Sequence, residues 1–311
     1  RVEVGIIRAP GPEEAMQGYM AYNFNAYSAV TQQLMFQSFF NPSPAHKYVP
    51  FSGGYLVPVD NNKGTNAFRY SGIAAMDWFR HGNWEFTYDA MVGSFAPPTS
   101  VGSFGDAPIF AGRLQESYII GGKGPFRGDV TGFAWYQYAR PIFNDRLYNF
   151  HREGFGVAYM QGYMHKYGRW FKADYIQGSG LIEAPAAFGL SAETYAAPNL
   201  YQAQVYPGIG NHAYGYSIRA GFFVLPKLEI DERYDYYNRL PNNDVQNRVF
   251  STWTTGVQYH VTPLMRLVLN YGVRDANAPH LSSIPAKTRP IAKSVTGSID
   301  NIFTAQFVAA F

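Results

Sequence analysis

Residues 84–92 read WEFTYDAMV, a stretch in which apolar and polar side chains alternate. One set of alternate positions holds Trp84, Phe86, Tyr88, Ala90 and Val92, and the other holds Glu85, Thr87, Asp89 and Met91. A β-strand places alternate side chains on opposite faces, whereas a helix would scatter both sets around its axis. The stretch therefore predicts a strand with one apolar face and one polar face.

The same alternation recurs along the chain. Between Met265 and Asp275, Leu267, Leu269 and Val273 oppose Arg266, Asn270 and Arg274. By this template about thirteen segments alternate, near residues 1–8, 25–40, 68–81, 84–95, 108–121, 128–143, 152–166, 169–183, 213–225, 227–239, 249–262, 265–276 and 299–311. Most of them reach the roughly 9–11 residues that a tilted strand needs to cross a bilayer, whereas ordinary strands have about 5–6. We therefore predict an all-β fold: one antiparallel transmembrane β-barrel domain over residues 1–311, with about 12–16 strands.

Composition supports this class. Aromatic residues make up 17% of the chain and charged residues only 15%, whereas soluble proteins carry about 25% charged residues. The mean hydropathy of -0.22 is too polar for a bundle of membrane helices, and no run approaches the roughly 18 apolar residues of a spanning helix. A net charge of +3 is too small to indicate a nucleic-acid partner.

Catalytic and metal-binding patterns are absent from the sequence. The chain has no cysteine, which excludes disulfides, thiolate metal sites and covalent haem attachment. His81, His151, His165 and His260 are isolated from one another in the sequence. No Ser/His/Asp set or carboxylate pair stands at a recognisable spacing, so we predict no enzyme, no cofactor and no metal site.

Connections between the predicted strands alternate between short and long. The short ones lie at 81–83, 121–124, 167–169, 226–227 and 262–264, and the long ones near 41–67, 96–107, 144–151, 184–212, 240–248 and 277–297. Outer-membrane barrels have short periplasmic turns and long extracellular loops. With the C-terminus in the periplasm, every short connection becomes periplasmic. We therefore expect the outer membrane of a Gram-negative-type bacterium, with its lipid and lipopolysaccharide as surroundings.

Aromatic side chains gather at the predicted strand ends. On the face assigned to lipid, Trp78, Trp84, Tyr163, Phe171, Tyr259 and Phe311 lie near periplasmic ends, and Phe68, Tyr70, Tyr214, Tyr216 and Trp253 near extracellular ends. Two such girdles are typical of barrels at the membrane interfaces. The last segment carries Phe307 and ends on Phe311, which resembles the C-terminal signal read by the barrel-assembly machinery.

The number of predicted strands is odd, whereas bacterial single-chain barrels have even numbers. Either further strands precede residue 1, or one of the predicted segments does not span the membrane. The first segment is one candidate for a non-spanning piece, and residues 12–22 form another, as a helix or plug.

Several late motifs resemble the closing strands of the phosphate-selective porin family. They are Glu232-Arg233-Tyr234-Asp235, Thr254-Thr255-Gly256-Val257-Gln258-Tyr259, Thr262-Pro263 and Arg266-Leu267-Val268-Leu269-Asn270-Tyr271, within the last quarter of the chain. The resemblance implies a diffusion channel of about sixteen strands that is often a homotrimer.

Charged side chains on the polar face are predicted to line the pore. The cations are Arg69, Arg113, Lys172, Arg219, Arg233, Arg266 and Arg274. The anions include Asp89, Asp231 and Asp235, together with Asp77, Glu85, Asp174 and Glu229. Because the two sets nearly balance, they also fit a plain structural role, in which they hydrate and cross-link the lumen.

The sequence thus predicts a porin with a water-filled channel for passive diffusion of small ions and solutes, with weak anion preference. The alternative is a barrel that sheathes another protein, such as a multihaem cytochrome in an electron-transfer complex across the outer membrane.

Overall fold

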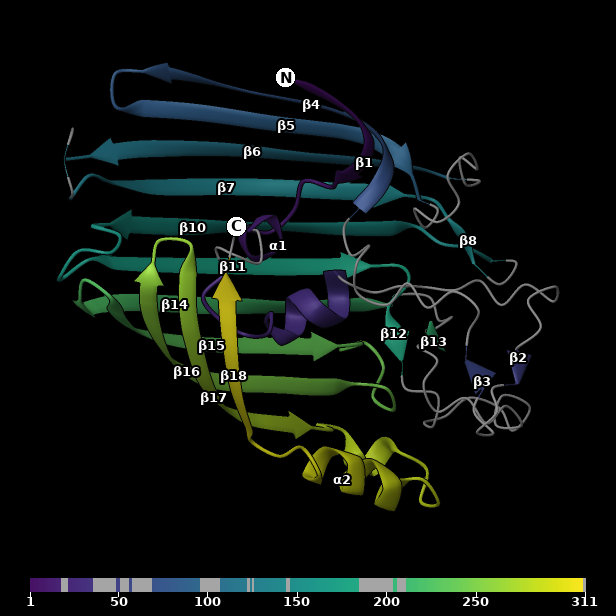
Figure 1. The fold of residues 1–311 in the computed structure, drawn as a ribbon. Helices are drawn as coiled ribbons and strands as arrows, with labels where there is room; N and C mark the ends of the chain where they lie inside the picture. Colours follow the sequence, from purple (N-terminus) through teal and green to yellow (C-terminus); the bar gives the residue numbers. More distant parts are fainter. Residues whose placement is uncertain are drawn as a thin grey trace.

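Twelve strands form one antiparallel sheet in this computed structural model of the chain. The structure describes residues 1–17, 22–35, 49–50, 56–57, 69–95, 107–121, 124, 126–143, 146–184, 204–205 and 211–309. The strand order β1-β4-β5-β6-β7-β10-β11-β14-β15-β16-β17-β18 follows the chain, so each strand pairs with its predecessor in the sheet (Figure 1). The edges are β1 and β18, and no pairing between described residues joins them.

The strands of this sheet are β1 (Val2–Arg8), β4 (Arg69–His81), β5 (Trp84–Ser94), β6 (Pro108–Ile120), β7 (Gly128–Ala139), β10 (Phe150–Gln161), β11 (Arg169–Ser179), β14 (His212–Leu225), β15 (Leu228–Arg239), β16 (Arg248–Thr262), β17 (Met265–Asn277) and β18 (Ile302–Ala309). Three two-residue pairs join β2 (Val49–Pro50) to β3 (Leu56–Val57), β8 (Ile142–Phe143) to β9 (Arg146–Leu147) and β12 (Glu183–Ala184) to β13 (Gln204–Val205). Among the described residues the helical elements are α1 (Glu13–Met16), the π-helical turn η1 (Thr31–Met35), the 3₁₀ turn η3 (Leu281–Ser283) and α2 (Arg289–Gly297).

Connections at the two ends of the sheet differ in length. The short ones are 82–83, 121–127, 162–168, 226–227 and 263–264. They share one end because successive strands run antiparallel. In the two-residue connection 82–83, Gly82 has a φ of 60°, which glycine adopts without the steric cost that a side chain would bring. The strand ends that lead into the longer connections, including the one with α2, lie at the other end.

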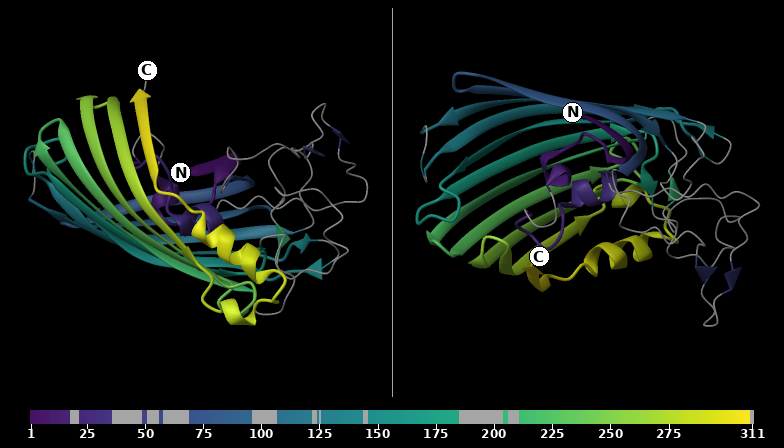
Figure 2. Two further views of the ribbon diagram at one scale, coloured as in Figure 1. Left: turned by 90° about the horizontal axis from the view of Figure 1, so that it is seen from below. Right: turned by 45° about the horizontal axis from the view of Figure 1, so that its top comes forward.

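The two faces of the sheet have opposite character. The sheet curls so that one face is concave, and α1 and η1 lie on this side (Figure 2). The outer face exposes many large apolar side chains, for example Leu114 at 57% and Phe155 at 60%. On the concave face, by contrast, charged side chains such as Arg219 and Asp231 are buried. This is the reverse of a soluble domain, in which large apolar side chains are mostly buried and charged side chains mostly exposed.

Residues 9–17 and 22–35, here named the inner segment, lie on the concave side between β1 and β4 in the chain (Figure 1). Val30 and Leu34 of this segment pack in one buried cluster with Ile176 and Tyr237 of the sheet. Residues 25–40 were predicted to be a strand. That prediction is wrong for the described part, because residues 25–35 include the turn η1 and pair with no strand. The helix or plug considered for residues 12–22 corresponds to α1 within the inner segment.

The orientation predicted for residues 68–81 is also wrong. Strand β4 pairs with β5 so that Ile73 faces Val92 and Phe79 faces Phe86, both on the outer face. Arg69 and Asp77 share the alternation of Ile73 and therefore lie on the outer face rather than inside. The sequence of β4 has apolar side chains on both faces, so only the pairing with β5 decides its orientation.

Apart from residues 25–40, the predicted segments correspond one to one to the twelve strands of the sheet, and residues 68–81 correspond to β4. Their ends differ most near 152–166, where β10 stops at Gln161, and near 128–143 and 169–183, where β7 stops at Ala139 and β11 at Ser179. Near 299–311 the described strand covers Ile302–Ala309.

Candidate functional site

The concave face brings charged side chains from several strands together. Because side chains alternate along each strand, every second residue of β5, β6, β11, β14, β15 and β17 points toward the inner segment. The predicted interior residues that lie on this face are Glu85, Asp89, Arg113, Lys172, Asp174, Arg219, Glu229, Asp231, Arg233, Asp235 and Arg266. On this face, cations are direct neighbours across the strands: Lys172 lies opposite Arg219, and Arg219 lies opposite Arg233. Adjacent cations of this kind need counter-charges nearby.

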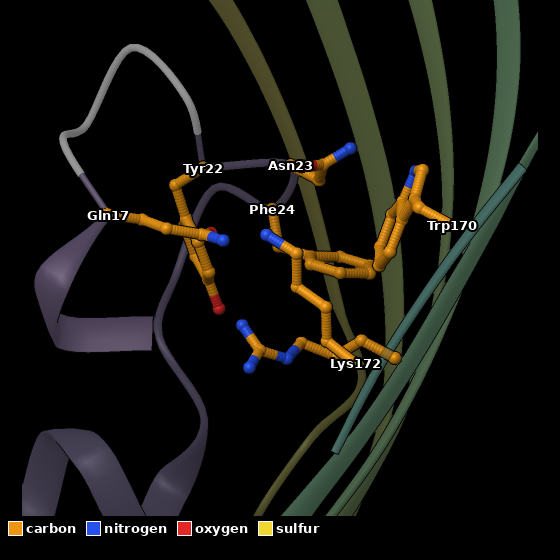
Figure 3. A pocket seen from close by; sticks show the side chains of 7 residues that line it. Gln17, Tyr22, Asn23, Phe24, Trp170 and Lys172 are labelled. Atoms are coloured by element: carbon orange, nitrogen blue, oxygen red, sulfur yellow. The ribbon is translucent and has the colours of Figure 1, made fainter. Parts of the chain in front are cut away.

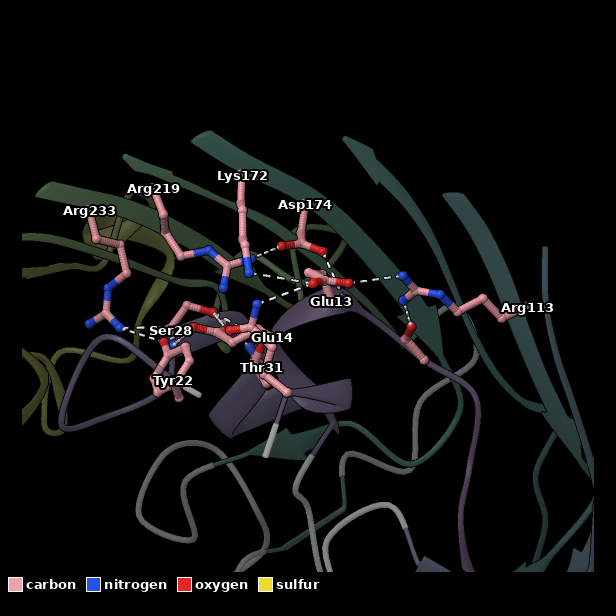
Figure 4. A network of polar contacts seen from close by, with 12 residues as sticks. Glu13, Glu14, Tyr22, Ser28, Thr31, Arg113, Lys172, Asp174, Arg219 and Arg233 are labelled. Atoms are coloured by element: carbon pink, nitrogen blue, oxygen red, sulfur yellow. Dashed lines mark hydrogen bonds and ion pairs between the residues drawn. The ribbon is translucent and has the colours of Figure 1, made fainter. Parts of the chain in front are cut away.

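Glu13 of the inner segment joins two strands of the wall (Figure 4). Its Oε2 lies 2.9 Å from Nη2 of Arg113 on β6, and its Oε1 lies 3.5 Å from Nζ of Lys172 on β11. The backbone N–H of Glu13 also donates to Oδ1 of Asp174, at 3.0 Å. Charge-assisted hydrogen bonds of this kind are stronger than neutral ones, so Glu13 anchors α1 to the middle of the sheet.

Glu14 lies at the next position and is fully buried. Its Oε1 accepts a hydrogen bond from the backbone N–H of Ser28 at 2.9 Å and another from the hydroxyl of Tyr22. The same oxygen lies 3.9 Å from Nη1 of Arg233 on β15. Glu14 therefore fixes the fold of the inner segment itself and points its charge at the wall (Figure 4).

Within the described part of the chain, each cation near Glu13 and Glu14 has a carboxylate close by. Asp174 forms an ion pair with Arg219, and Oδ2 of Asp235 lies 3.2 Å from Nε of Arg233. Together the ion pairs join Arg113, Lys172, Arg219 and Arg233 to Glu13, Glu14, Asp174 and Asp235, a set that we name the ion cluster. Two of its four carboxylates belong to the inner segment. Without that segment the wall would carry an excess of positive charge.

Both glutamates of the ion cluster are held in their charged form. Burial acts to raise the pKa of Glu13, but the positive charges of Lys172, Arg113 and Arg219 outweigh it and lower the pKa. Burial likewise acts to raise the pKa of Glu14, and Arg219 and Arg233 lower it below its usual range. The ion pairs are therefore intact at neutral pH.

A second buried polar group lies nearer the short connections. Oε1 of Glu229 accepts from the indole N–H of Trp170 and from Nδ2 of Asn23, the latter at 3.1 Å, and its Oε2 lies 2.8 Å from Nε2 of His260. Beside it, Arg266 donates to Gln258 and to the backbone carbonyl of Tyr22. This group holds the part of the inner segment around residues 22–23.

His260 stands alone in the sequence, but the pairing of β15 with β16 brings it to Glu229. The two residues are on different strands and far apart along the chain, so no spacing rule could have revealed the contact.

Arg152 of β10 holds the far end of the inner segment. Its guanidinium donates to the backbone carbonyl of Leu34 at 3.1 Å and to the carbonyls of Ser179, Gly180 and Leu181 at 2.7–3.0 Å. The side chain is fully buried, and all its described hydrogen bonds go to carbonyl oxygens. A planar guanidinium with several N–H groups suits this arrangement, because it can serve many acceptors at once.

Between the inner segment and the wall the packing is close. Figure 3 shows Gln17, Tyr22, Asn23 and Phe24 facing Trp170 and Lys172 across a small space. This space is too narrow to hold a water molecule. Here the inner segment therefore packs directly against β11 and β14 and leaves no room for water between them.

Some predicted site residues lie elsewhere. Arg69 is on the outer face, as described above. Arg274 has the inward alternation of β17 but is exposed near the long connections, where Nε donates to the carbonyl of Asp300 at 2.8 Å. Phe307 is exposed on the outer face, opposite Leu267 in register. Phe311 lies outside the described residues.

The sequence did not single out Glu13, Glu14 or Arg152. A pair of acidic residues between Pro12 and an apolar stretch was visible, but its cationic partners are about a hundred or more positions away along the chain.

Comparisons with known proteins give no family for this chain. A scan against protein-family models finds no match, and a search of curated proteins finds none either. Across the described residues, helices are too short or too polar to span a membrane. The same residues hold no group of three or more His, Asp or Glu side chains arranged to bind a metal ion.

Proposed function

We propose that this chain forms the wall of an outer-membrane porin, a water-filled channel for passive diffusion of small ions and solutes, with weak anion preference. The inner segment narrows the channel from within. In this arrangement the short connections and the C-terminus face the periplasm, and the long connections face the cell exterior.

The observation that carries the proposal is the inverted polarity of the sheet. The outer face exposes large apolar side chains on nearly every strand, such as Phe110, Phe155 and Phe307, at 52–60%. The concave face instead buries charged side chains. A lipid-facing apolar band around a polar interior is the pattern of transmembrane barrels. Strand length agrees with it, because β5 with 11 residues reaches, and β16 with 15 residues exceeds, the roughly 9–11 needed to cross.

The weak selectivity is supported by the charge balance of the interior. In the ion cluster, cations and carboxylates are equal in number. Near the short connections, the carboxylates of Glu229 and Asp231 stand close to the guanidinium of Arg266. Mixed rings of charge select less strongly than rings of one sign. The excess of basic residues in the whole chain, +3, tips the preference toward anions.

The alternative of a sheath around a cytochrome competes for the same space. The concave side of the described sheet is occupied by the inner segment, which hydrogen-bonds to residues of β6, β11, β15, β17 and β18. A partner protein inside this wall would have to displace it. For that reason we favour the porin.

Conductance across planar bilayers tests the proposal. The purified protein is inserted and the current measured in a salt gradient. A steady conductance with a reversal potential slightly on the anion side is expected. An inserted protein that never conducts, and that carries haem stain when isolated from its native membrane, would favour the sheath. Clear cation selectivity would contradict the anion preference.

Surface proteolysis of intact cells tests the orientation. Cleavage is expected within 184–212 or 277–297, while 121–124 and 262–264 are spared. Cleavage with the opposite pattern would mean that the barrel is inserted the other way round.

A further inference from the structure

A groove lies on the outer face of the sheet, over β5, β6 and β7. It has a volume of about 440 Å³ and is lined by Trp84, Phe86, Leu114, Glu116, Tyr118 and Gly132, among others. Trp84 is the first residue of β5 after a short connection, and Glu116 is close to the end of β6 at Ile120. The groove is therefore near the end of the sheet that carries the short connections.

Aromatic rings form its walls, and a glycine forms its floor. The rings of Trp84 and Tyr118 contact each other with centroids 4.8 Å apart. Phe86 and Gly132 are the register neighbours of Glu116 on either side. A Cβ added at Gly132 would meet no atom within 4 Å, so the space above this residue is open.

Glu116 is the charged residue of this groove. It is exposed and forms no hydrogen bond or ion pair with the part of the chain that the structure describes. On the same face, two other carboxylates do have partners: Glu153 accepts from Nε2 of Gln177, and Glu232 accepts from the indole N–H of Trp253 at 2.8 Å. An unpaired carboxylate on a lipid-facing surface is costly. A cation in the groove would remove this cost.

We propose that the groove binds the headgroup of a phospholipid with a primary ammonium, phosphatidylethanolamine. The inference rests on the proposed function, because only an inserted barrel has lipid at this face. An ammonium group offers three N–H donors to the Glu116 carboxylate. The aromatic rings of Trp84 and Tyr118 attract the same cation through their π faces.

The depth of the groove agrees with this ligand. About four residues separate Glu116 from the end of β6, which is roughly 13 Å along the strand. Strands in barrels tilt by about 35–45°, so the distance along the membrane normal is shorter, on the order of 10 Å. In the proposed orientation this position is on the periplasmic side, within reach of the headgroups of that leaflet.

Native mass spectrometry of the purified protein tests the inference. The protein is equilibrated with equal amounts of phosphatidylethanolamine and phosphatidylcholine that carry the same acyl chains, and the lipids retained are counted. Phosphatidylcholine is the matched probe, because its ammonium is fully methylated and has no N–H to donate. The wild type is expected to retain phosphatidylethanolamine several-fold over phosphatidylcholine.

Three variants locate the site. Glu116→Gln removes the charge and Gly132→Leu fills the groove, and each is expected to abolish the preference. Glu153→Gln removes an outer-face charge outside the groove and should leave the preference unchanged. Equal retention of the two lipids by the wild type would overturn the inference without any need for a variant. Undiminished preference in Glu116→Gln would overturn it as well.

Failure of the proposed function gives a different result. Sedimentation with vesicles shows whether the protein inserts at all, and a protein that does not insert would fail to sediment with vesicles of either lipid. An inserted protein without headgroup preference would contradict only the lipid binding proposed for the groove.

Discussion

The carboxylate of Glu13 lies 2.9 Å from the guanidinium of Arg113, and this ion pair ties a short helix inside the sheet to a strand of its wall. The same carboxylate reaches Lys172 on β11, so one side chain of the inner segment holds two strands of the concave face. Breaking a buried ion pair by removing one partner leaves an uncompensated charge. The position of the inner segment should therefore depend on the charge of a few residues.

Glu13→Gln is expected to loosen the inner segment and, in a channel of the proposed kind, to increase the preference for anions. The amide keeps the shape of the side chain but leaves Arg113 and Lys172 with one counter-charge fewer. Glu13 retains an exposure of 21%, so we expect a cost of about 2 kcal/mol, below the 3–5 kcal/mol of a fully buried pair. Reversal potentials in a salt gradient measure the change. Glu153→Gln on the outer face is the control, and an equal shift in both variants would contradict the role of Glu13.

Strong acid is expected to release the inner segment. The lowered pKa values of Glu13 and Glu14 mean that their stabilising effect is complete above the ordinary carboxyl value of 4.5 and is lost as the pH falls through the lowered values. The groups that face them are Arg113, Lys172, Arg219, Arg233 and Asp174.

A fluorophore on Met16→Cys can follow this release, since the natural chain has no cysteine. Its emission should change as the pH falls below the ordinary carboxyl value of 4.5, where Glu13 and Glu14 take up protons. The Glu13→Gln/Glu14→Gln double variant is the control and should show a weaker transition. A change centred near neutral pH would mean that other groups control the docking.

Arg152→Lys is expected to destabilise the end of the inner segment although the charge is kept. Lysine lacks the planar fork that serves the carbonyls of Leu34, Ser179, Gly180 and Leu181. Buried carbonyls left without a donor cost about 1–3 kcal/mol. The midpoint of urea unfolding in lipid or detergent measures the loss. Arg169→Lys, an exposed change near a short connection, should leave the midpoint unchanged.

Leu269→Arg tests whether the outer face of β17 meets lipid. Leu269 lies on that face, in register with Val257 and Ala305. An arginine near the bilayer midplane costs about 2–4 kcal/mol. The free energy of refolding into vesicles is the measurement, and Leu269→Met is the apolar control, expected to cost less than about 1.5 kcal/mol. Similar values for the two variants would contradict contact with lipid at this position.

Deletion of Phe311 tests the assembly signal. If the machinery reads the terminal aromatic, the deletion should lower insertion into the outer membrane while synthesis stays normal. The variant Phe311→Tyr keeps an aromatic residue at the end and should insert as the wild type does. Fractionation of cells with an antibody to the protein measures both. Normal insertion of the shortened chain would show that the terminal residue is dispensable.

The strands and their two faces could be predicted from the sequence because the period of two is a local property. In residues 84–92 and 265–275 the alternation is regular, and the strands β5 and β17 have the predicted faces. Where the local pattern is irregular, prediction fails. Strand β4 has Tyr70 and Trp78 on one alternation and Ile73 and Phe79 on the other, so its orientation follows only from its register with β5.

Asn270 illustrates the limit of a prediction from alternation alone. The alternation correctly places Asn270 on the face opposite to Leu269. If the Asn270 side chain only faced water, its replacement would cost little stability. In the structure its Oδ1 accepts a hydrogen bond from the backbone N–H of Asn25, at 2.8 Å. Its replacement by an apolar residue should therefore disturb the inner segment.

The sequence by itself determined that this chain is an all-β protein with long antiparallel strands, one apolar face and one charged face, because side-chain alternation and turn composition act between near neighbours. Only the tertiary structure decided that residues 25–35 form no strand of the sheet and that Glu13 and Glu14 neutralise cations on its concave face. Those contacts join the inner segment to residues about a hundred or more positions away. Local patterns hold no information on which distant side chains meet, because that depends on the register and curvature of the whole sheet.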